Sequence, residues 1–171
     1  MEHTYEYAYG RVVLKPLERK DIEELRVLRN RERQYFLSQG IIMPEGQITW
    51  YDSYLKKEND IMFKVARADR LEKFIGAIAV YDIDKSAGCA EFGRLVIDKE
   101  KAPEKGIGLE ATVAACNFAF EKLGVSRITA VAVKDNERAL KVYAKAGFRV
   151  CDDSDEEVYV LEVTRELLRN A

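Results

Sequence analysis

Short apolar stretches rich in β-branched residues alternate with helical stretches along this chain. The short stretches predict strands at residues 11–17, 61–68, 74–81, 90–97, 127–133, 148–151 and 158–163. Apolar residues at helical spacing predict helices over 21–40, 47–57, 109–123 and 139–145. The order β-α-α-β-β-β-α-β-α-β-β predicts an α/β (α+β) fold with a mixed, mostly antiparallel central sheet and helices on both faces.

A length of 171 residues predicts one domain whose core needs no disulfides. No repeat or interior linker divides residues 11–171, so we expect a single domain there. Residues 1–10 are rich in tyrosine but have no clear period, and we expect a frayed arm without a function. Residues 165–170 are expected to form a short tail.

Composition narrows the classes of partner. The sequence has 28 Lys and Arg residues against 30 Asp and Glu, a formal net charge of −2. This balance offers no overall field for nucleic acid or an anionic membrane, and we expect neither as a partner. No apolar run reaches membrane-spanning length, and the N-terminus lacks a signal-peptide core. We therefore expect a cytoplasmic protein.

The cysteine and histidine content points away from metal chemistry. Cys89, Cys116 and Cys151 lie in apolar or strand-like contexts without C-x-x-C spacing, and His3 is the single histidine. We expect three buried, reduced thiols and no metal site.

A pair of glycines, Gly106 and Gly108, stands where a charged loop meets the apolar helix 109–123. The first amides of a helix lack intrahelical partners and carry the positive end of the dipole, so they can bind a phosphate. The alternative is a tight loop that needs two permissive φ angles. A third interpretation, the dinucleotide fingerprint G-x-G-x-x-A, is set aside because a charged loop separates the glycines from the preceding strand and no βαβ series surrounds them.

The element order, the glycine pair and an N-x-x-A-x-x-x-Y motif before Gly-Phe together resemble the GCN5-related N-acetyltransferase (GNAT) family. The matching residues are Gly106, Gly108, Asn136, Ala139, Tyr143, Gly147 and Phe148. The likeness covers nearly the whole chain from Arg11. Residues 90–92 and 42–50 resemble the branch with ribosomal-protein N-terminal, spermidine and amino-sugar nucleotide acetyltransferases.

This resemblance implies an enzyme that moves an acetyl group from acetyl-CoA directly to a primary amine of a small molecule or peptide. The amides of Lys105, Gly106, Ile107 and Gly108 would hold the pyrophosphate of the donor. The pantetheine amides would pair with Leu95, Val96 and Ile97 like an added strand. The family's central strand and the next strand splay apart to admit this arm.

Two departures from the family pattern affect the expected donor site. Pro103 stands where the family usually has Arg or Gln, and Glu104 stands where many relatives have glycine. Glu104 brings a like charge near the phosphates, which Lys101 and Lys105 are positioned to offset. These departures leave open a non-catalytic coenzyme A-binding or regulatory module of the same fold.

Glu91 is the candidate general base for deprotonating the amine. Uninterrupted strand alternation places it on the face of Leu95 and Ile97, where a carboxylate is otherwise out of place. A salt bridge, or a bulge that turns Glu91 to solvent, is the alternative. Several relatives have a glutamate on the next strand, but that position is Val131 here, so without Glu91 a water relay would serve.

Tyr143 is the candidate general acid for the departing thiolate. Asn136, Ala139 and Tyr143 share one helix face, and the first and last lie about 10 Å apart along the axis, which suits a pantetheine arm. Small Ala139 leaves room for that arm. The alternatives are a core tyrosine and an asparagine that caps the helix.

Aromatic residues between the first two helices are candidates for the acceptor site. Tyr35, Phe36 and Trp50 would line a substrate mouth, or would hold the two helices together. The sequence leaves the acceptor open among an amino-sugar nucleotide, a polyamine and a protein N-terminus. It also leaves open a monomer or a homodimer.

Overall fold

The computed structural model describes residues 1–169, so Asn170 of the expected tail and Ala171 lie outside the described part. The strands are β1 Tyr7–Tyr9, β2 Val12–Pro16, β3 Asp60–Arg67, β4 Gly76–Asp84, β5 Cys89–Ile97, β6 Arg127–Val133, β7 Arg149–Asp152 and β8 Val158–Thr164. The helices are α1 Ile22–Arg31, α2 Pro44–Leu55, α3 Ile107–Phe118 and α4 Glu137–Ala146, with short helical turns η1 Arg19–Asp21, η2 Arg33–Tyr35 and η3 Ala119–Leu123.

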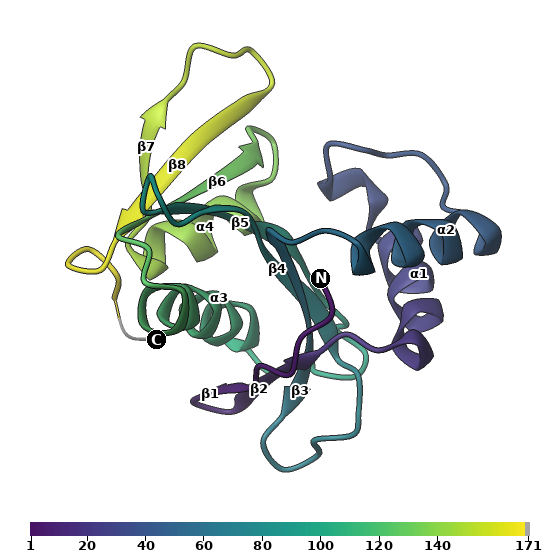
Figure 1. The fold of residues 1–171 in the computed structure, drawn as a ribbon. Coiled ribbons are helices and arrows are strands. Elements are labelled where there is room, and N and C mark those ends of the chain that lie inside the picture. The colour runs from purple at the N-terminus through teal and green to yellow at the C-terminus, as the bar shows by residue number, and fades with distance from the viewer. Residues whose placement is uncertain (170–171) are drawn as a thin grey trace.

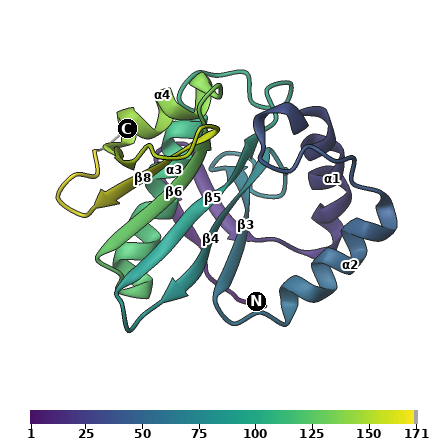
Figure 2. The same ribbon diagram turned by 90° about the horizontal axis from the view of Figure 1, so that it is seen from above.

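The eight strands form one sheet in the order β1-β2-β3-β4-β5-β6-β8-β7. Every neighbouring pair in the described chain is antiparallel except β5 and β6, which are parallel. Helices α1 and α2 cover one face, and α3 and α4 cover the other (Figures 1 and 2). The predicted fold class, with its mixed sheet and helices on both faces, is confirmed.

Each face has its own apolar core. On the α3 face, Phe63, Phe92 and Phe118 are buried with most of α3. On the α1 and α2 face, Leu25 and Leu28 pack with aromatic residues of α2. The apolar residues of α1 recur at helical spacing, as an amphipathic helix on a sheet requires, whereas α3 is apolar on nearly every side because the sheet, the N-terminal strands and α4 surround it.

The first helix is shorter than predicted. It ends at Arg31, and the chain passes through η2 into an extended residue, Phe36, instead of continuing to Gly40. Residues 32–40 lack a continuous apolar face, and Leu37 is exposed, so packing does not favour further helical turns. Helix α2 begins at Pro44, earlier than predicted, because proline in the first turn needs no N–H partner.

The N-terminal segment is an ordered part of the sheet, so the expected frayed arm is wrong. Strand β1 pairs with β2. His3 bonds through Nε2 to the Met62 carbonyl at 3.0 Å, and the Tyr5 ring packs edge-on against Phe118 at 5.2 Å. These contacts depend on residues far along the chain, which explains why the local pattern does not predict them.

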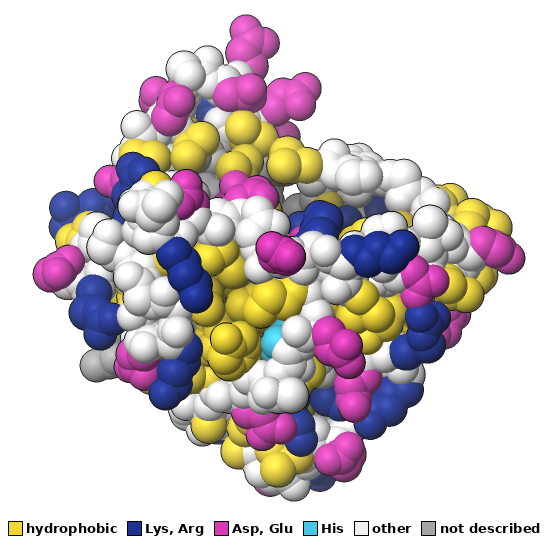
Figure 3. Space-filling model, viewed as in Figure 1, with side chains coloured by type: hydrophobic (Ala, Val, Ile, Leu, Met, Phe, Trp, Pro, Cys, Tyr) yellow, Lys and Arg dark blue, Asp and Glu magenta, His cyan; other side chains and the backbone are white. Residues whose placement is uncertain are grey.

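The three cysteines are free, but they are not all buried. Cys116 is buried in α3, Cys89 is half-buried, and Cys151 is exposed on the edge strand β7. The expectation of three buried thiols is therefore wrong for Cys151. The acidic side chains of residues 152–157 gather at the tip of the β7–β8 hairpin (Figure 3). Within residues 1–169, no helix has the length and apolar character needed to cross a membrane.

Phe118 tests the contribution of the α3-face core. Its ring is fully buried and meets Phe63 edge-on at 5.0 Å. Phe118→Ala should lower the free energy of unfolding by about 3–5 kcal/mol, because the cavity left behind adds to the lost transfer energy. Urea denaturation measures this, with the half-exposed Val27→Ala as the control. Equal stability of the two variants would contradict this core assignment.

Candidate active site

Strands β5 and β6 pair over a short distance and then separate. Their parallel ladder ends where Glu91 faces Thr129. Beyond that point β5 continues to Ile97 and β6 to Val133 without pairing with each other. The gap opens into a cavity of about 550 Å³, lined by both strands, α4, the start of α3 and the segment that follows α1. The predicted splay of these strands is confirmed.

The N-terminus of α3 presents free backbone amides at one end of this cavity. Gly106 caps the helix with φ of +95°, a left-handed conformation that glycine adopts without strain. Within the described chain, no protein acceptor is bonded to the amides of residues 105–108. Unpaired amides at the positive end of a helix dipole can bind an anion.

Arg11 and Glu110 hold this loop in place. The backbone N and Nε of Arg11 donate to the Glu110 carboxylate at 2.7 and 2.8 Å. Nη2 of Arg11 donates to the Lys105 carbonyl at 2.9 Å and would lie 3.0 Å from a β carbon on Gly106. The loop is therefore fixed through carbonyl and side-chain contacts, which leave its amides available.

The charges expected beside this loop are arranged differently from the prediction. Glu104 forms an ion pair with Arg67, and Lys101 forms one with Glu24. A backbone hydrogen bond and Arg67 hold the pKa of Glu104 below its ordinary value. Arg67 rather than Lys101 thus offsets Glu104, while Lys105 lines the cavity as expected.

A β-bulge in β5 changes which side chains share a face of the sheet. The register against β4 gains one residue between Gly93 and Val96. Leu95 and Ile97 pack on the α3 face, whereas Val96 packs on the α1 and α2 face. The uninterrupted alternation that would place Glu91 on the side of Leu95 and Ile97 is therefore wrong.

Arg94 accommodates the extra residue of the bulge. Its φ is +53°, a left-handed conformation that costs about 1–3 kcal/mol in a residue other than glycine. Its Nη1 donates to both carboxylate oxygens of the buried Asp60 at 2.8 and 3.0 Å. Its guanidinium also lies 4.2 Å from the centre of the Tyr81 ring. These contacts offset the backbone strain.

Glu91 lies on the α1 and α2 side of the sheet, opposite Tyr81. The Tyr81 hydroxyl donates a hydrogen bond to the Glu91 carboxylate. Burial and this hydrogen bond raise the pKa of Tyr81, which keeps the phenol protonated. A β carbon on Gly93 would lie 2.9 Å from the Tyr81 hydroxyl, so glycine leaves room for the pair. Glu91 is half-buried in the cavity wall and pairs with no cation in the described chain.

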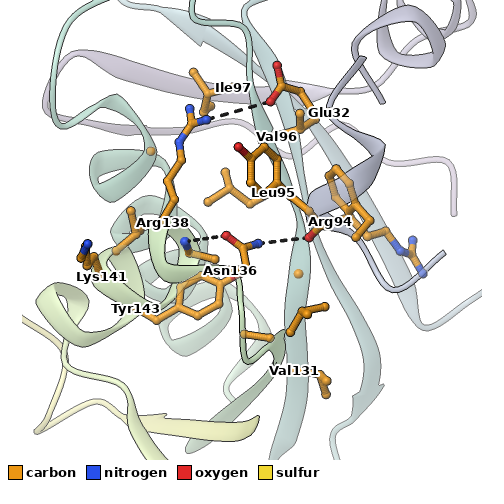
Figure 4. Close-up of a pocket in the computed structure, with 18 of the residues that line it drawn as sticks. Glu32, Arg94, Leu95, Val96, Ile97, Val131, Asn136, Arg138, Lys141 and Tyr143 are labelled. Atoms are coloured by element: carbon orange, nitrogen blue, oxygen red, sulfur yellow. Dashed lines mark hydrogen bonds and ion pairs between the residues drawn. The ribbon is translucent and has the colours of Figure 1, made fainter. Parts of the chain in front are cut away.

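Tyr143 combines a buried ring with a hydroxyl that has no protein partner. The residue is 5% exposed, and its ring packs against Phe92 and Phe148, each at 5.5 Å. Its hydroxyl, unlike its ring, is open to the cavity that Tyr143 lines, and no group among residues 1–169 is hydrogen-bonded to it. Burial raises its pKa well above the ordinary value. Figure 4 shows Tyr143 and Asn136 on the α4 side, across from Leu95 on β5.

Asn136 joins α4 to the segment after α1. Its Oδ1 accepts from the Ala139 amide at 3.0 Å, which caps α4, and its Nδ2 donates to the Tyr35 carbonyl at 3.0 Å. Arg138 reaches Glu32 at 4.0 Å in the same region. Figure 4 shows the two hydrogen bonds of Asn136 and the ion pair between Arg138 and Glu32. The cap interpretation of Asn136 is confirmed, and the second contact fastens residues 32–36 beside the cavity.

The cavity brings together most of the predicted site residues. It is lined by Tyr35, Phe36, Glu91, Leu95, Val96, Ile97, Lys105, Gly106, Gly108, Asn136, Ala139 and Tyr143. Ile107 is fully buried and is not among the residues that line the cavity. Trp50 does not line the cavity. Its ring stacks on Tyr54 of the same helix, with ring centres 5.7 Å apart, and packs against the apolar cluster that α1 and α2 share, which supports the helix-packing alternative.

The cavity is also lined by residues that the sequence did not predict as site residues, and Arg29, Tyr81 and Arg94 are among them. The sequence contains a pattern that could have identified Arg29, because this residue follows Leu25 and Leu28 at helical spacing and so lies on the inward face of α1. Tyr81 carried a weaker signal as an aromatic residue at the end of a strand. In residues 1–169, no cluster of three or more His, Cys, Asp or Glu side chains is arranged to hold a metal ion.

Both the sequence and the fold of this chain are similar to those of known proteins. A family described as an acetyltransferase (GNAT) domain matches residues 11–149. A Bacillus subtilis (strain 168) protein named "Probable N-acetyltransferase YjcK" is 30% identical over 80% of each chain. The Escherichia coli (strain K12) spermidine N(1)-acetyltransferase is 26% identical over 92% of this chain and 83% of its own.

Solved structures share the fold at low sequence identity. FdhC, described as a nucleotide-linked sugar GNAT, has a TM-score of 0.83 at 18% identity, over 96% of this chain and 92% of its own. Spermidine N-acetyltransferase from Vibrio cholerae, in complex with CoA and spermine, has a TM-score of 0.81 at 20% identity, over 92% of this chain and 97% of its own.

Asn136 provides a test of how the segment after α1 is held. Asn136→Ala should lower the free energy of unfolding by about 1 kcal/mol through loss of the cap. Asn136→Asp keeps the capping oxygen but loses the donor to Tyr35, so it should be less destabilising. Both variants should speed amide exchange in residues 33–36, measured by hydrogen–deuterium exchange. Unchanged exchange in both would mean that Asn136 does not fasten this segment.

Proposed function

Because this chain belongs to the GNAT acetyltransferase family and is an N-acetyltransferase, we propose that it moves the acetyl group of acetyl-CoA directly to the primary amine of a small molecule. The observation that carries this proposal is the continuity of the cavity. It runs from the free amides at the start of α3, along the unpaired edge of β5, to the unpartnered hydroxyl of Tyr143.

The residues present fit an acetyl-CoA donor, which supplies an activated thioester when bound. The free amides of residues 105–108 would hold the pyrophosphate, and Lys105 adds a positive charge beside it. Leu95, Val96 and Ile97 offer a strand edge with no β6 partner, which would pair with the pantetheine amides. Asn136 and Ala139 would border the arm on the α4 side.

Tyr143 would act as the general acid. Its raised pKa keeps the phenol protonated throughout the neutral range, so a proton is available for the departing sulfur. Backbone amides near Leu95 or Val96 would stabilise the developing oxyanion, since they are preorganised on the free edge of β5.

Glu91 would act as the general base from the other side of the sheet. As the amine nitrogen bonds to the carbonyl carbon, the amine proton passes to Glu91, the carbon–sulfur bond breaks and Tyr143 protonates the thiolate. An amine with a pKa near 10.4 costs about 4–5 kcal/mol to deprotonate at pH 7, so a base contributes substantially. Tyr81 would orient the Glu91 carboxylate through its hydrogen bond.

The acceptor would enter on the side of α1 and α2. Tyr35 and Phe36 line the cavity there, close to the segment that Asn136 fastens. Trp50 is left out of this role because it stacks on Tyr54 away from the cavity. We further propose a cytoplasmic protein, since free thiols such as the exposed Cys151 persist in a reducing compartment, and a monomer or homodimer.

Release of free thiol from acetyl-CoA in the presence of amines tests the proposed donor and reaction. Tyr143→Phe should lower kcat by about 100-fold while the KM for acetyl-CoA stays near the wild-type value, because the hydroxyl acts in the transition state. Tyr159→Phe, on β8 outside the cavity, serves as the matched control. An unchanged kcat in Tyr143→Phe would remove Tyr143 from its role as acid. Absence of thiol release with every amine, together with absence of acetyl-CoA binding by calorimetry, would refute the proposed function.

The pH dependence of kcat/KM tests Glu91. Glu91→Gln should lower kcat/KM at neutral pH, and the remaining activity should rise tenfold per pH unit, because the amine must then lose its proton to solvent. Glu32→Gln removes the other cavity carboxylate and should retain the wild-type pH profile. If Glu91→Gln kept that profile as well, Glu91 would not be the base.

A further inference from the structure

Arg29 is the unusual charged group of the cavity. It lies on α1, lines the cavity and stacks on Phe36 with its guanidinium carbon 3.4 Å from the ring centre. Its Nη1 is buried and has no hydrogen-bond partner. No other buried side-chain nitrogen or oxygen in the described residues lacks one. An unsatisfied buried donor in an otherwise satisfied structure requires an explanation, such as a ligand that is absent.

The carboxylates that face the cavity do not neutralise Arg29. Glu32 pairs with Arg31 at 3.4 Å and Arg138 at 4.0 Å, and Glu91 accepts from Tyr81. In the described chain, no carboxylate forms an ion pair with Arg29. Burial and the neighbouring Arg94 lower the pKa of Arg29 to about 10, so the group is still charged at neutral pH.

A guanidinium that is buried without an ion-pair partner is unfavourable until an anion binds to it. A buried charge without a partner costs several kcal/mol, and a planar guanidinium matches a carboxylate or phosphate with parallel hydrogen bonds. Seven Lys and Arg side chains line the whole cavity against the two carboxylates of Glu32 and Glu91, and those other than Lys105, which is placed with the donor pyrophosphate, favour the same sign of ligand. A polyamine would meet repulsion there.

The contacts around Arg29 connect it with the candidate base. Arg94 lies close enough to shift the pKa of Arg29, Arg94 stacks over Tyr81, and Tyr81 bonds to Glu91. These residues belong to α1 and to the face of the sheet that α1 and α2 cover. The free amides that suit a donor pyrophosphate belong to α3, which packs on the opposite face.

We propose that the acceptor is a small primary amine that also carries an anionic group, a carboxylate or a phosphate, and that Arg29 binds this group while the amine points to Glu91. This inference rests on the proposed acetyl transfer. It names the class of acceptor and makes Arg29 a determinant of specificity. Phe36 supports the guanidinium from behind and holds it in position.

Matched pairs of amines test the proposal by measuring kcat/KM with saturating acetyl-CoA. The pairs are glucosamine and glucosamine 6-phosphate, ethanolamine and phosphoethanolamine, and butylamine and 4-aminobutyrate, with spermidine as the polycation. We expect the member that carries the anionic group to exceed its partner without one, called the neutral amine below because it has no anionic group, by about 10- to 100-fold, the value of one hydrogen bond between charged groups. The phosphate and carboxylate pairs distinguish the two possible anions. Preference for spermidine or for the neutral members would overturn the proposal.

Variants of Arg29 separate this role from the proposed acetyl transfer. Arg29→Gln should remove the preference of about 10- to 100-fold in kcat/KM for the anionic amine over its matched partner, while the KM for acetyl-CoA stays near the wild-type value. Arg29→Lys should restore part of the preference. Arg33→Gln, outside the cavity, is the matched control, and circular dichroism checks that each variant is folded.

A second measurement does not depend on finding the natural acceptor. Inorganic phosphate and acetate should inhibit turnover of a neutral amine competitively with that amine, and Arg29→Gln should abolish the inhibition. Inhibition competitive with acetyl-CoA that disappears in Arg29→Gln, or a raised KM for acetyl-CoA in that variant, would assign Arg29 to the donor and refute the proposal. If neutral amines are acetylated and neither ion inhibits, the acceptor inference fails while the acetyltransferase function stands.

Discussion

The early end of the β5–β6 ladder is the constraint on which the rest of the site depends. After Glu91 the two strands diverge, so the backbone of residues 95–97 has no sheet neighbour on the β6 side. Backbone N–H and C=O groups of a strand that lack a neighbouring strand must form hydrogen bonds with water or with a ligand. Because the N-terminus of α3 opens into the same cavity with free amides, the fold provides an unpaired strand edge and an anion site in one continuous space.

The bulge in β5 determines how chemistry is distributed around this space. It places Glu91 on the side of α1 and α2, opposite Leu95 and Ile97, whereas Tyr143 approaches from α4. In the proposed reaction, Tyr143 as the acid and Glu91 as the base would therefore reach the carbonyl from different sides, so that a donor and an acceptor would approach along different walls of the cavity. The strained conformation of Arg94 is maintained because its guanidinium is held by several contacts.

Much of the fold followed from periodicity, because the strands and α3 have long, uniform apolar patterns. The free amides at the start of α3 were also predictable, since Gly106 and Gly108 have a defined conformational and steric role at a helix start. The bulge was not, because a left-handed Arg94 leaves no mark in the sequence. Residues 32–39 contain no Gly or Pro, so the sequence pattern does not predict that α1 ends at Arg31. Arg29 lacks a hydrogen-bond partner because of where residues from distant parts of the chain lie in the fold. A local sequence pattern does not encode that arrangement.

The most direct test of this account is the amide spectrum of the isotope-labelled protein, recorded by nuclear magnetic resonance with two donors. Acetyl-CoA carries the diphosphate, whereas acetyl-pantetheine has the thioester arm alone. The account predicts that acetyl-CoA shifts the amides of residues 105–108 and 95–97, and that acetyl-pantetheine shifts those of 95–97 while those of 105–108 stay in place. Amides of 105–108 that do not respond to acetyl-CoA would contradict it.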